Sequence, residues 1–487
     1  MAQVTREKDV TKKNVVLIFP RLSIQSPTFL QTPFSLITIA PYLEKAGYRV
    51  DIIDIRTTHN FKKTLSSVIS QNTVFAGIST MTGSQITNAV EVSKFIKKNF
   101  SVPIVWGGIH PTLMPQQVIK EDYVDIVSLG EGEKNIVELA TCLEAGQSLK
   151  EVKGIHYKED GEVRETQPNE LFDLKDSLPP SWHLIDKSKY NIFGIQTGRG
   201  CPYRCEYCYN YLFNKGKWRS KPLDQIFHEI EQLVNIHGVK KILFYDDNFF
   251  TSKKRVEDIC HFIIENRLDI EWVTTCRSDY FTKYGKEFFQ LVKESGCDTL
   301  AIGVESGSQR ILDLLNKQET LEDSINMAKI TNEVGITPEC GFMIGIPGET
   351  KKDRIKTYDF IDKLVSINPK LYVTSLAIYT PYPGAPLIEK IEKEYNFRMP
   401  ENLEDWCNFN YHNCNLLWIE KSEQKKMEAI SYIPRFVFWR EKLKERYVKL
   451  WQLPIYYFMI FLAGLRWKYR FFNFPVEYSV LKMWIEH

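Results

Sequence analysis

Apolar runs of membrane-spanning length, strong net charge and repeats are absent from the sequence. The apolar run LPIYYFMIFLAGL at 453–465 has 13 residues, and a membrane-spanning helix needs about 20. A net charge of +2 argues against bulk nucleic-acid binding, which normally depends on a strong basic excess. With no internal repeat or low-complexity tract, the 487 residues are expected to form two or three globular domains.

Cysteine is also scarce. The chain has 10 cysteines, and its opening segment MAQVTREKDVTKK is polar and charged, without the apolar stretch of a secretory signal. Disulfides need an oxidising compartment, so we expect reduced thiols in a cytoplasmic protein. Most of the cysteines are scattered, as reduced thiols would be: Cys142, Cys260, Cys276, Cys297, Cys340, Cys407 and Cys414.

The other three cysteines are crowded into CPYRCEYC, at Cys201, Cys205 and Cys208. A zinc site usually takes four ligands in two separated pairs, and no second CxxC occurs in the chain. Three thiolates suit an iron–sulfur cluster better, because four irons held by three cysteines leave one iron open to another ligand. Zinc and a chance grouping remain the alternatives.

The first 150 residues have the pattern of a nucleotide-binding α/β domain. Short apolar segments alternate with segments of helical periodicity, and the expected strands are 14–19, 50–56, 73–79, 102–108 and 125–130. The pattern predicts a doubly wound, Rossmann-like sheet of five parallel strands, with a ligand crevice at their carboxyl ends.

Small and polar residues stand at three of those strand ends. They are Ser79 and Thr80, Gly107 and Gly108, and Gly130 and Glu131. Small residues at such positions let a ligand approach the backbone closely. Tight strand-to-helix turns without a ligand are the alternative interpretation.

A polar segment with Pro179 and Pro180 predicts a linker over 151–190, followed by a second domain over 191–400. Six strands are expected there: 191–197, 240–248, 270–277, 299–306, 340–348 and 371–381. Because six strand–helix units are too few for an eight-stranded barrel, the pattern predicts a partial (β/α)6 barrel. Function in such barrels gathers at the C-terminal ends of the strands, and the cysteine segment follows the first strand.

The later strands of this predicted barrel end in residues suited to a ligand site. These residues are Asp246, Asp247, Arg277, Glu305, Gly345 and Tyr379. A residue such as Asp247 or Glu305 could by itself be an ordinary helix cap. Their recurrence around one cysteine segment favours a common site.

The motifs of residues 14–400 resemble those of the radical S-adenosylmethionine (SAM) family, in the branch that has a cobalamin-binding domain. The resemblance rests on CxxxCxxC, FYDDNFF, CRSDY, GVESGS, GFMIGIPGET and TPYPGAPL, together with STM and GG in the first domain. This branch includes methyltransferases and the anaerobic cyclase of chlorophyll synthesis.

The resemblance implies a [4Fe–4S] cluster on Cys201, Cys205 and Cys208, with SAM on the open iron. One electron from the cluster would cleave SAM into methionine and a 5′-deoxyadenosyl radical, which abstracts a hydrogen from the substrate. By position in the motifs, the implied SAM contacts are Tyr207, Gly345 and Tyr379 at the adenine, Asp246 or Asp247 at the amino group, Arg277 at a carboxylate and Glu305 at the ribose or amino group. A flavodoxin or ferredoxin is implied as electron donor.

The resemblance also implies cobalamin in the first domain, held by Ser79, Thr80, Gly107, Gly108, Gly130 and Glu131. The aspartate–histidine motif of cobalamin-binding domains is missing, because its expected place near Thr32–Ile37 has the sequence TPFSLI. His59 and His110 follow other strands. We therefore expect the lower face of a bound cobalamin to lack a protein histidine.

Residues 401–487 lose the alternation of strands and helices and become rich in aromatic residues. Basic residues flank the 13-residue apolar run, and Arg440–His487 contains nine Lys and Arg against four Asp and Glu. One interpretation is a helical cap over the barrel and its substrate. The other is an interfacial helix that contacts an anionic membrane, which would suit a lipid-like substrate.

The leading hypothesis is a radical SAM enzyme that uses cobalamin to methylate an unactivated carbon of a small-molecule or lipid-like substrate. A radical cyclase, oxidase or rearranging enzyme of the same architecture, acting on a lipid or tetrapyrrole, is the first alternative. A non-catalytic cobalamin or iron–sulfur sensor is the second. We expect a cytoplasmic protein without a nucleic-acid partner, in contact with a membrane if the C-terminal helix is interfacial.

Overall fold

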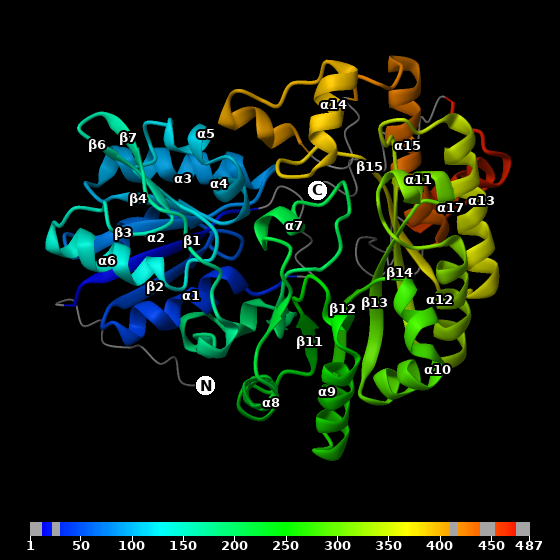
Figure 1. The fold of residues 1–487 in the computed structure, drawn as a ribbon, viewed down its shortest axis with the longest axis horizontal. Helices are drawn as coiled ribbons and strands as arrows, with labels where there is room; N and C mark the ends of the chain where they lie inside the picture. The colour runs from blue at the N-terminus through cyan, green and yellow to red at the C-terminus, as the bar shows by residue number, and fades with distance from the viewer. Residues whose placement is uncertain (1–11, 22–29, 410–415, 439–452, 474–487) are drawn as a thin grey trace. The chain divides into compact units, whose positions relative to one another are not determined.

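The computed structural model describes residues 12–21, 30–409, 416–438 and 453–473 (Figure 1). The chain divides into two compact units. The first unit consists mainly of Gln31–Tyr190, with the N-terminal strand and Pro400–Asn408. The second consists mainly of Asn191–Met399 and the described residues that follow Asn408.

The first unit contains a seven-stranded sheet in the order β2-β1-β3-β4-β5-β6-β7. Its first five strands are parallel, and β6 and β7 add an antiparallel hairpin at one edge. The strands are β1 (Asn14–Phe19), β2 (Arg49–Asp54), β3 (Thr73–Ser79), β4 (Ile104–Gly107), β5 (Ile126–Ser128), β6 (Ile155–Glu159) and β7 (Glu162–Glu165). The helices are α1 (Phe34–Lys45), α2 (Phe61–Val68), α3 (Gln85–Asn99), α4 (Ile109–Leu113), α5 (Pro115–Ile119) and α6 (Asn135–Ala145).

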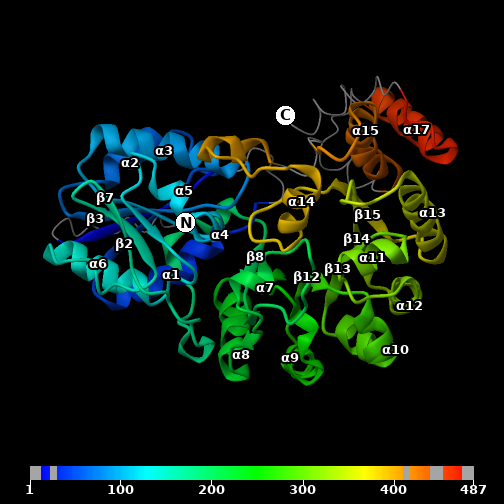
Figure 2. The ribbon, with the colours of Figure 1, turned by 45° about the horizontal axis from the view of Figure 1, so that its top comes forward.

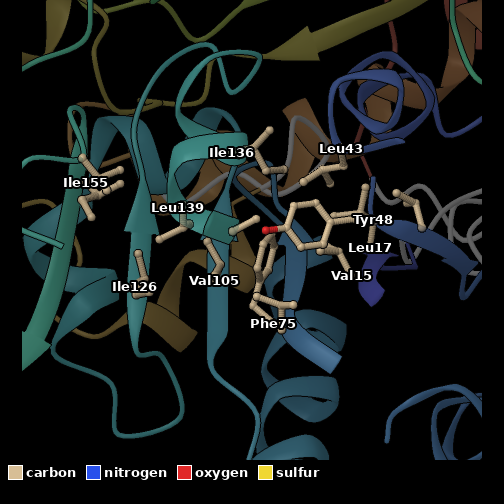
Figure 3. Close-up of a cluster of buried hydrophobic side chains, with 14 of the residues drawn as sticks. Val15, Leu17, Leu43, Tyr48, Phe75, Val105, Ile126, Ile136, Leu139 and Ile155 are labelled. Atoms are coloured by element: carbon tan, nitrogen blue, oxygen red, sulfur yellow. The ribbon is translucent and has the colours of Figure 1, made fainter. Parts of the chain in front are cut away.

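Helices cover both faces of this sheet, as Figures 1 and 2 show. Helices α1 and α6 contact each other and β1, β2 and β3, whereas α2 and α3 contact β2 and β4 from the other face. Under α1 and α6, the strand residues Val15, Leu17 and Phe75 share one buried cluster with Ile136 and Leu139 (Figure 3). Burial on both faces explains why the strand sequences are almost continuously apolar.

The second unit contains six parallel strands that follow one another in chain order, β8-β11-β12-β13-β14-β15. They are β8 (Phe193–Ile195), β11 (Lys241–Phe244), β12 (Glu271–Cys276), β13 (Cys297–Glu305), β14 (Thr337–Ile344) and β15 (Tyr372–Ile378). A two-stranded sheet pairs β9 (Gly198–Arg199) with β10 (Arg219–Ser220). The helices up to β15 are α7 (Asn210–Phe213), α8 (Leu223–Glu231), α9 (Lys253–Glu265), α10 (Asp279–Glu294), α11 (Gln309–Leu314), α12 (Leu321–Val334) and α13 (Lys351–Ile367).

Two of these helices begin with capping boxes. Thr320 at the start of α12 and Thr350 at the start of α13 each accept a hydrogen bond from the backbone N–H of an aspartate three residues later, and that aspartate accepts one in return. Both caps directly follow loops that carry buried carboxylates, Glu319 before Thr320 and Glu349 before Thr350.

The last part of the chain is helical. Helix α14 (Leu387–Tyr395) precedes a 3-10 turn, η7 (Leu403–Asn408), which belongs to the first unit and contacts α3. Helix α15 (Lys421–Phe438) packs on β15, and α17 (Leu453–Tyr469) packs on α15. Within the described ranges, no helix combines the length and apolarity required to cross a membrane.

The predicted fold class is confirmed: a Rossmann-like sheet, a six-stranded partial barrel and a helical C-terminal part are all present. Two boundaries differ. Part of the segment expected as a linker, 151–190, forms the hairpin β6–β7, and Pro400–Asn408 returns to the first unit. Cys414 and the basic residues of 439–452 and 474–487 lie outside the described residues.

Candidate active site

A cavity of about 480 Å³ in the second unit is lined by all three cysteines of the CPYRCEYC segment. Residues at the carboxyl ends of β11, β12 and β13 form much of its wall, as the strand-end rule for barrels predicts. The polar lining is completed by Tyr207, Tyr209, Asn210, Asp247, Asn248, Thr275, Arg277, Glu305, Lys317, Glu339 and Thr374.

Each of the three sulfur atoms has an N–H donor beside it. The Asn248 side chain donates to Cys201 Sγ at 3.5 Å, and the backbone N–H of Asn210 donates to Cys208 Sγ at 3.5 Å. Arg277 Nη1 lies 3.9 Å from Cys205 Sγ and donates to it. Such donors stabilise thiolates and tune the potential of a cluster bound to them.

The three thiols do not converge on a single point: in the described part of the chain, no group of three or more Cys, His, Asp or Glu side chains is arranged to hold one metal ion. A [4Fe–4S] cluster does not require that arrangement, because each cysteine binds a different iron. Burial raises the pKa of Cys205 and raises that of Cys208 to about 11. Metal ligation requires thiolates, so cluster loading is expected to release protons.

A buried group of charges adjoins the cysteines. Lys317 Nζ lies 3.2 Å from Glu305 Oε1 and 3.2 Å from the Tyr207 hydroxyl, and that hydroxyl donates to Glu305 Oε1 at 2.8 Å. Glu305 has a φ of +66°, a left-handed conformation that is costly for a residue with a side chain. A Cβ at Gly303 would come within 2.3 Å of Glu305 Oε1, so the glycine makes room for this ion pair.

Arg277 is held from several sides. Its Nε donates to Asp279 Oδ1 at 2.8 Å, and its Nη2 donates to the Lys317 carbonyl at 2.7 Å and lies 3.2 Å from Glu319 Oε1. Burial raises the pKa of Glu319 to about 7. The guanidinium therefore lines the cavity as predicted, but its Nη1 points to Cys205, and a SAM carboxylate would compete with protein carboxylates for the remaining donors.

The two aspartates at the end of β11 have different environments. Asp247 lines the cavity, and its Oδ2 accepts from the Gly200 N–H at 2.7 Å. Asp246 is absent from the lining; its carboxylate accepts from the backbone N–H of Thr197 at 2.7 Å and pairs with Arg255 at 3.4 Å. Asp246 thus holds the start of the cysteine segment, and Asp247 is the one that could face a ligand.

Gly345 and Tyr379 are not part of the cavity wall. A Cβ at Gly345 would come within 2.7 Å of side chains of Leu416 and Met427, and its carbonyl accepts from Trp418 Nε1 at 2.8 Å. The Tyr379 ring is buried with its centroid 6.1 Å from that of Trp418. The segment before α15 and its first turns therefore cover these two positions.

A second, smaller cavity of about 140 Å³ lies in the first unit at the carboxyl ends of the parallel strands. Four of the predicted residues line it: Ser79, Gly107, Gly108 and Gly130. Thr80 and Glu131 are not among the lining residues. The Thr80 N–H donates to the Gly107 carbonyl at 2.8 Å, and the Glu131 carboxylate accepts from the Phe172 N–H at 2.7 Å. Further lining residues are Ser35, Gly77, Ser128, Gly132, Leu17, Phe75, Val105, Ile136 and Leu139.

Glycines shape this second cavity. A Cβ at Gly77, inside β3, would come within 3.0 Å of Leu17 Cδ2. Gly108 has a φ of +102°, and a Cβ there would come within 2.8 Å of the Thr80 carbonyl oxygen. The result is a narrow slot with an apolar interior and a serine rim, where Ser35 Oγ and Ser79 Oγ lie 3.1 Å apart. A flat, largely apolar group with a polar attachment, such as the nucleotide tail of cobalamin, fits this lining.

The two histidines that the sequence analysis considered, His59 and His110, lie outside the slot. His110 is fully buried, with Nδ1 3.0 Å from Thr82 Oγ1 and its ring centroid 5.5 Å from that of Trp406. Burial lowers its pKa to about 4. His59 is exposed. The residues that line the slot include neither of them.

Two family models match the two units. Residues 195–361 match the radical SAM superfamily, and residues 21–140 match the B12 binding domain. An uncharacterized methyltransferase of Pyrococcus horikoshii is 35% identical over 318 residues, which are 64% of this chain and 68% of the relative. The anaerobic magnesium-protoporphyrin IX monomethyl ester cyclase of Cereibacter sphaeroides is 28% identical over 318 residues, 61% of this chain and 51% of that relative.

Among solved structures, the cobalamin-dependent S-adenosylmethionine radical enzyme OxsB with aqua-cobalamin bound has a TM-score of 0.73. The match covers 97% of this chain and 75% of that chain at 21% identity, so it shows the shared fold.

A cysteine-lined partial barrel and a glycine-lined Rossmann-like slot, carried by the same chain, together define a radical SAM enzyme with a corrinoid domain. This chain belongs to the radical SAM superfamily and carries a B12 binding domain. A [4Fe–4S] cluster, SAM and cobalamin are the cofactors of these two domains.

Proposed function

We propose that this enzyme is a cobalamin-dependent methyltransferase that acts on an unactivated carbon of a small molecule. One observation carries the proposal: the chain has two cavities, one in the second unit lined by the three cysteines and one in the first unit lined by glycines. The relative at 35% identity, which is named a methyltransferase, supports the choice of reaction.

In this proposal, Cys201, Cys205 and Cys208 hold the cluster. When bound, the cluster supplies the electron that cleaves SAM, and cobalamin carries the methyl group. Asn248 and Arg277 orient two of the thiolates through the N–H groups that they already direct at sulfur. The protein's contribution in this proposal is binding, orientation and electrostatics.

We propose Tyr207, Asp247, Arg277 and Glu305 as the SAM contacts inside the cavity. Lys317 joins them as a residue that the sequence did not single out: its ammonium neutralises Glu305 and lies near the Tyr207 hydroxyl. Contacts of Gly345 and Tyr379 with the adenine stay a prediction. Asp246 is proposed to act indirectly, through the Thr197 backbone at the base of the cysteine segment.

For cobalamin we propose the slot residues Ser79, Gly107, Gly108 and Gly130, with Ser35 at the rim. Thr80 and Glu131 are proposed to stabilise the loops that carry these residues. The Thr80 N–H donates to the Gly107 carbonyl, and the Glu131 carboxylate accepts from the Phe172 N–H. Among the described residues, those that line the slot include no histidine; a cobalamin without a histidine ligand stays a prediction.

A reduced protein such as flavodoxin or ferredoxin is proposed as the electron donor, in the cytoplasm. The described cysteines are all free thiols, as that compartment requires.

A radical cyclase is the second candidate. The observation that favours it is the 28% identity to the magnesium-protoporphyrin IX monomethyl ester cyclase. The two reactions differ in their products: a methyl transfer converts SAM to S-adenosylhomocysteine beside 5′-deoxyadenosine, whereas cyclisation yields 5′-deoxyadenosine alone.

The test begins with anaerobically purified, cluster-reconstituted protein incubated with cobalamin and desalted. We expect about four irons and one cobalt per chain, and reductive formation of 5′-deoxyadenosine from SAM together with S-adenosylhomocysteine. Cys208→Ala should lose most of its iron and at least ~1000-fold of the SAM cleavage, because the thiolate is a cluster ligand. Cys142→Ser, a half-buried thiol in the first unit, is the matched control and should retain both.

Iron without retained cobalt, and 5′-deoxyadenosine without S-adenosylhomocysteine, would replace the methyltransferase by the cyclase-type enzyme. A Cys208→Ala protein with unchanged iron and SAM cleavage would contradict the cluster assignment itself.

A further inference from the structure

Helix α17 is apolar around its whole circumference, although only one side of it is packed against the protein. The buried side consists of Tyr456, Met459, Ala463 and Trp467, at the spacing of a single helix face. Trp467 Nε1 donates to Asp362 Oδ1 of α13 at 2.7 Å, which anchors the helix to the second unit. Figure 2 shows α17 on the outer side of α15.

The other side of α17, together with Phe471 just beyond it, forms an exposed apolar face. Exposed large hydrophobic residues elsewhere in the described chain are scattered singly, whereas these are concentrated on one helix and the residues that follow it. They are Ile455 (47% exposed), Tyr457 (49%), Phe458 (58%), Phe461 (60%), Leu465 (38%), Tyr469 (67%) and Phe471 (52%). A contiguous patch of this kind marks a surface that meets another apolar phase.

Basic residues adjoin this exposed apolar face. The sequence from Leu453 to Asn473 has no acidic residue and contains Arg466, Lys468 and Arg470. Arg470 lies between α17 and α13, where it pairs with Asp359 and Asp362.

A cavity of about 270 Å³ lies at the C-terminal end of the helix. Four cations line it, Lys351, Arg354, Lys426 and Arg470, with Glu423 as the carboxylate in the lining. Outside the lining, Arg354 also lies 3.6 Å from Glu349, and Arg470 pairs with the two aspartates of α13. The lining also includes Ile355, an apolar side chain that is 41% exposed. Such a cavity, lined by cations and adjoining exposed apolar side chains, fits the anionic headgroup of an amphipathic molecule such as a lipid.

We propose that the exposed face of α17 binds the surface of an anionic membrane, with the helix parallel to the bilayer and the basic cavity taking a lipid phosphate. With 17 residues the helix is about 26 Å long at 1.5 Å per residue, too short to span the roughly 30 Å hydrocarbon core. Its tyrosines and phenylalanines suit the headgroup boundary.

Charge argues against a second copy of the chain as the occupant. A symmetric dimer through this face would place the same patch of each subunit against the other. The interface would then contain Arg466 and Lys468 of both subunits without a carboxylate from Leu453–Asn473 of either one. An anionic lipid surface is instead complementary, because it attracts basic residues that lie near it.

The test is co-flotation of the full-length protein with vesicles of phosphatidylcholine alone or with 30% phosphatidylglycerol (a composition chosen to give a surface charge at about physiological levels). We expect binding to the anionic vesicles that falls steeply as salt rises from about 0.1 to 0.5 M. Phe458→Asp with Phe461→Asp should reduce the bound fraction at least ~10-fold, because it places two carboxylates in the apolar boundary. Both positions are exposed, so folding is not at risk.

Matched controls separate the face from general effects. Ile236→Asp changes a residue that is 63% exposed elsewhere in the second unit and should bind like the unaltered protein. Lys351→Glu with Lys468→Glu should weaken binding to anionic vesicles by ~10-fold or more, whereas Lys254→Glu with Lys283→Glu, of equal charge change, should not.

Absence of vesicle binding would overturn the proposal, as would binding that survives the Phe458 and Phe461 substitutions. A dimer in light scattering that becomes a monomer in the same double variant, without lipid binding, would assign the face to a second copy instead. Because the readout is binding, none of these outcomes depends on methyl transfer.

Discussion

His110 is a buried titratable residue that belongs to neither ligand site. Its side chain is 0% exposed, and in the described part of the chain its Nε2 atom has no hydrogen-bond partner. Burial favours the neutral imidazole and lowers the pKa to about 4, whereas an unfolded histidine titrates near 6.5.

A pH-dependent stability follows from this difference. Between pH 6.5 and pH 4 the histidine is protonated in the unfolded state but neutral in the folded state, so the free energy of unfolding falls as the pH is lowered through this window. The loss is at most about 3 kcal/mol for a shift of this size. Urea unfolding at pH 7 and pH 4.5 should show it, and His110→Phe should lose that part of the pH dependence. An identical pH dependence in His110→Phe would contradict this account.

At the residue scale, the sequence singled out the cysteine segment and cavity residues at strand ends, and it did not single out Lys317. Asp247, Arg277 and Glu305 were found because the carboxyl ends of parallel strands share one edge, and Cys201 because three cysteines are crowded into CPYRCEYC. Lys317 lies in a loop between Asn316 and Gln318, which both have positive φ, and only the fold shows that this turn carries its ammonium to Glu305. No local pattern announces such a turn when it contains no glycine.

Strand β3 shows how one glycine can turn a packed sheet into a binding element. The strand is buried at nearly every position. Gly77 lines the slot, and because it has no Cβ it avoids a 3.0 Å contact with Leu17 Cδ2. An isolated glycine in a strand is itself a signal of close approach by a ligand or another chain segment. That signal was available in TVFAGIS and would have added Gly77 to the predicted slot.

Adding a side chain at Gly77 tests the slot. Gly77→Val should lower retained cobalamin at least ~10-fold, because its methyl groups occupy the slot, while iron per chain stays unchanged. Gly77→Ala should give a smaller loss, which guards against misfolding of the valine variant. Gly464→Val is the matched control, since nothing lies within 4 Å of a Cβ there. Full cobalt retention in Gly77→Val, measured after desalting, would place cobalamin elsewhere.

The hairpin β6–β7 explains the misplaced linker. All four residues of β7 are exposed, so the segment is polar and lacks the apolar alternation on which the other strands were recognised. Its turn, Asp160-Gly161, has positive φ at both residues, as tight hairpin turns require. An aspartate–glycine pair between short alternating runs predicts a hairpin, even where the edge strand is polar.

At the scale of the whole molecule, the first unit is completed by residues far along the chain. Trp406 is fully buried, donates to Gln117 Oε1 at 2.6 Å and contacts the ring of His110. The same turn, η7, packs on α3. Neither composition nor periodicity could reveal this return, since the pairing depends on contacts between segments that are distant in sequence.

Trp406→Ala should therefore destabilise the first unit, by about 3–5 kcal/mol for a buried aromatic residue. Hydrogen exchange followed by mass spectrometry should show faster exchange in peptides from α3 and α5, with little change in α12. Trp418→Ala, in the second unit, serves as the control and should leave α3 and α5 unchanged. Equal exchange in all three proteins would show that η7 contributes nothing to the first unit.

The return of Pro400–Asn408 to the first unit also sets an order of events during synthesis. About 220 residues separate Tyr190 from the end of that segment, and at ~5–20 residues per second a ribosome takes roughly 10–45 s to add them. For that interval the nascent chain presents the surface around Gln117 without Trp406. The barrel of the second unit is translated during this interval. The first unit is therefore the first to begin folding, but its packing is completed only after the barrel has been synthesised.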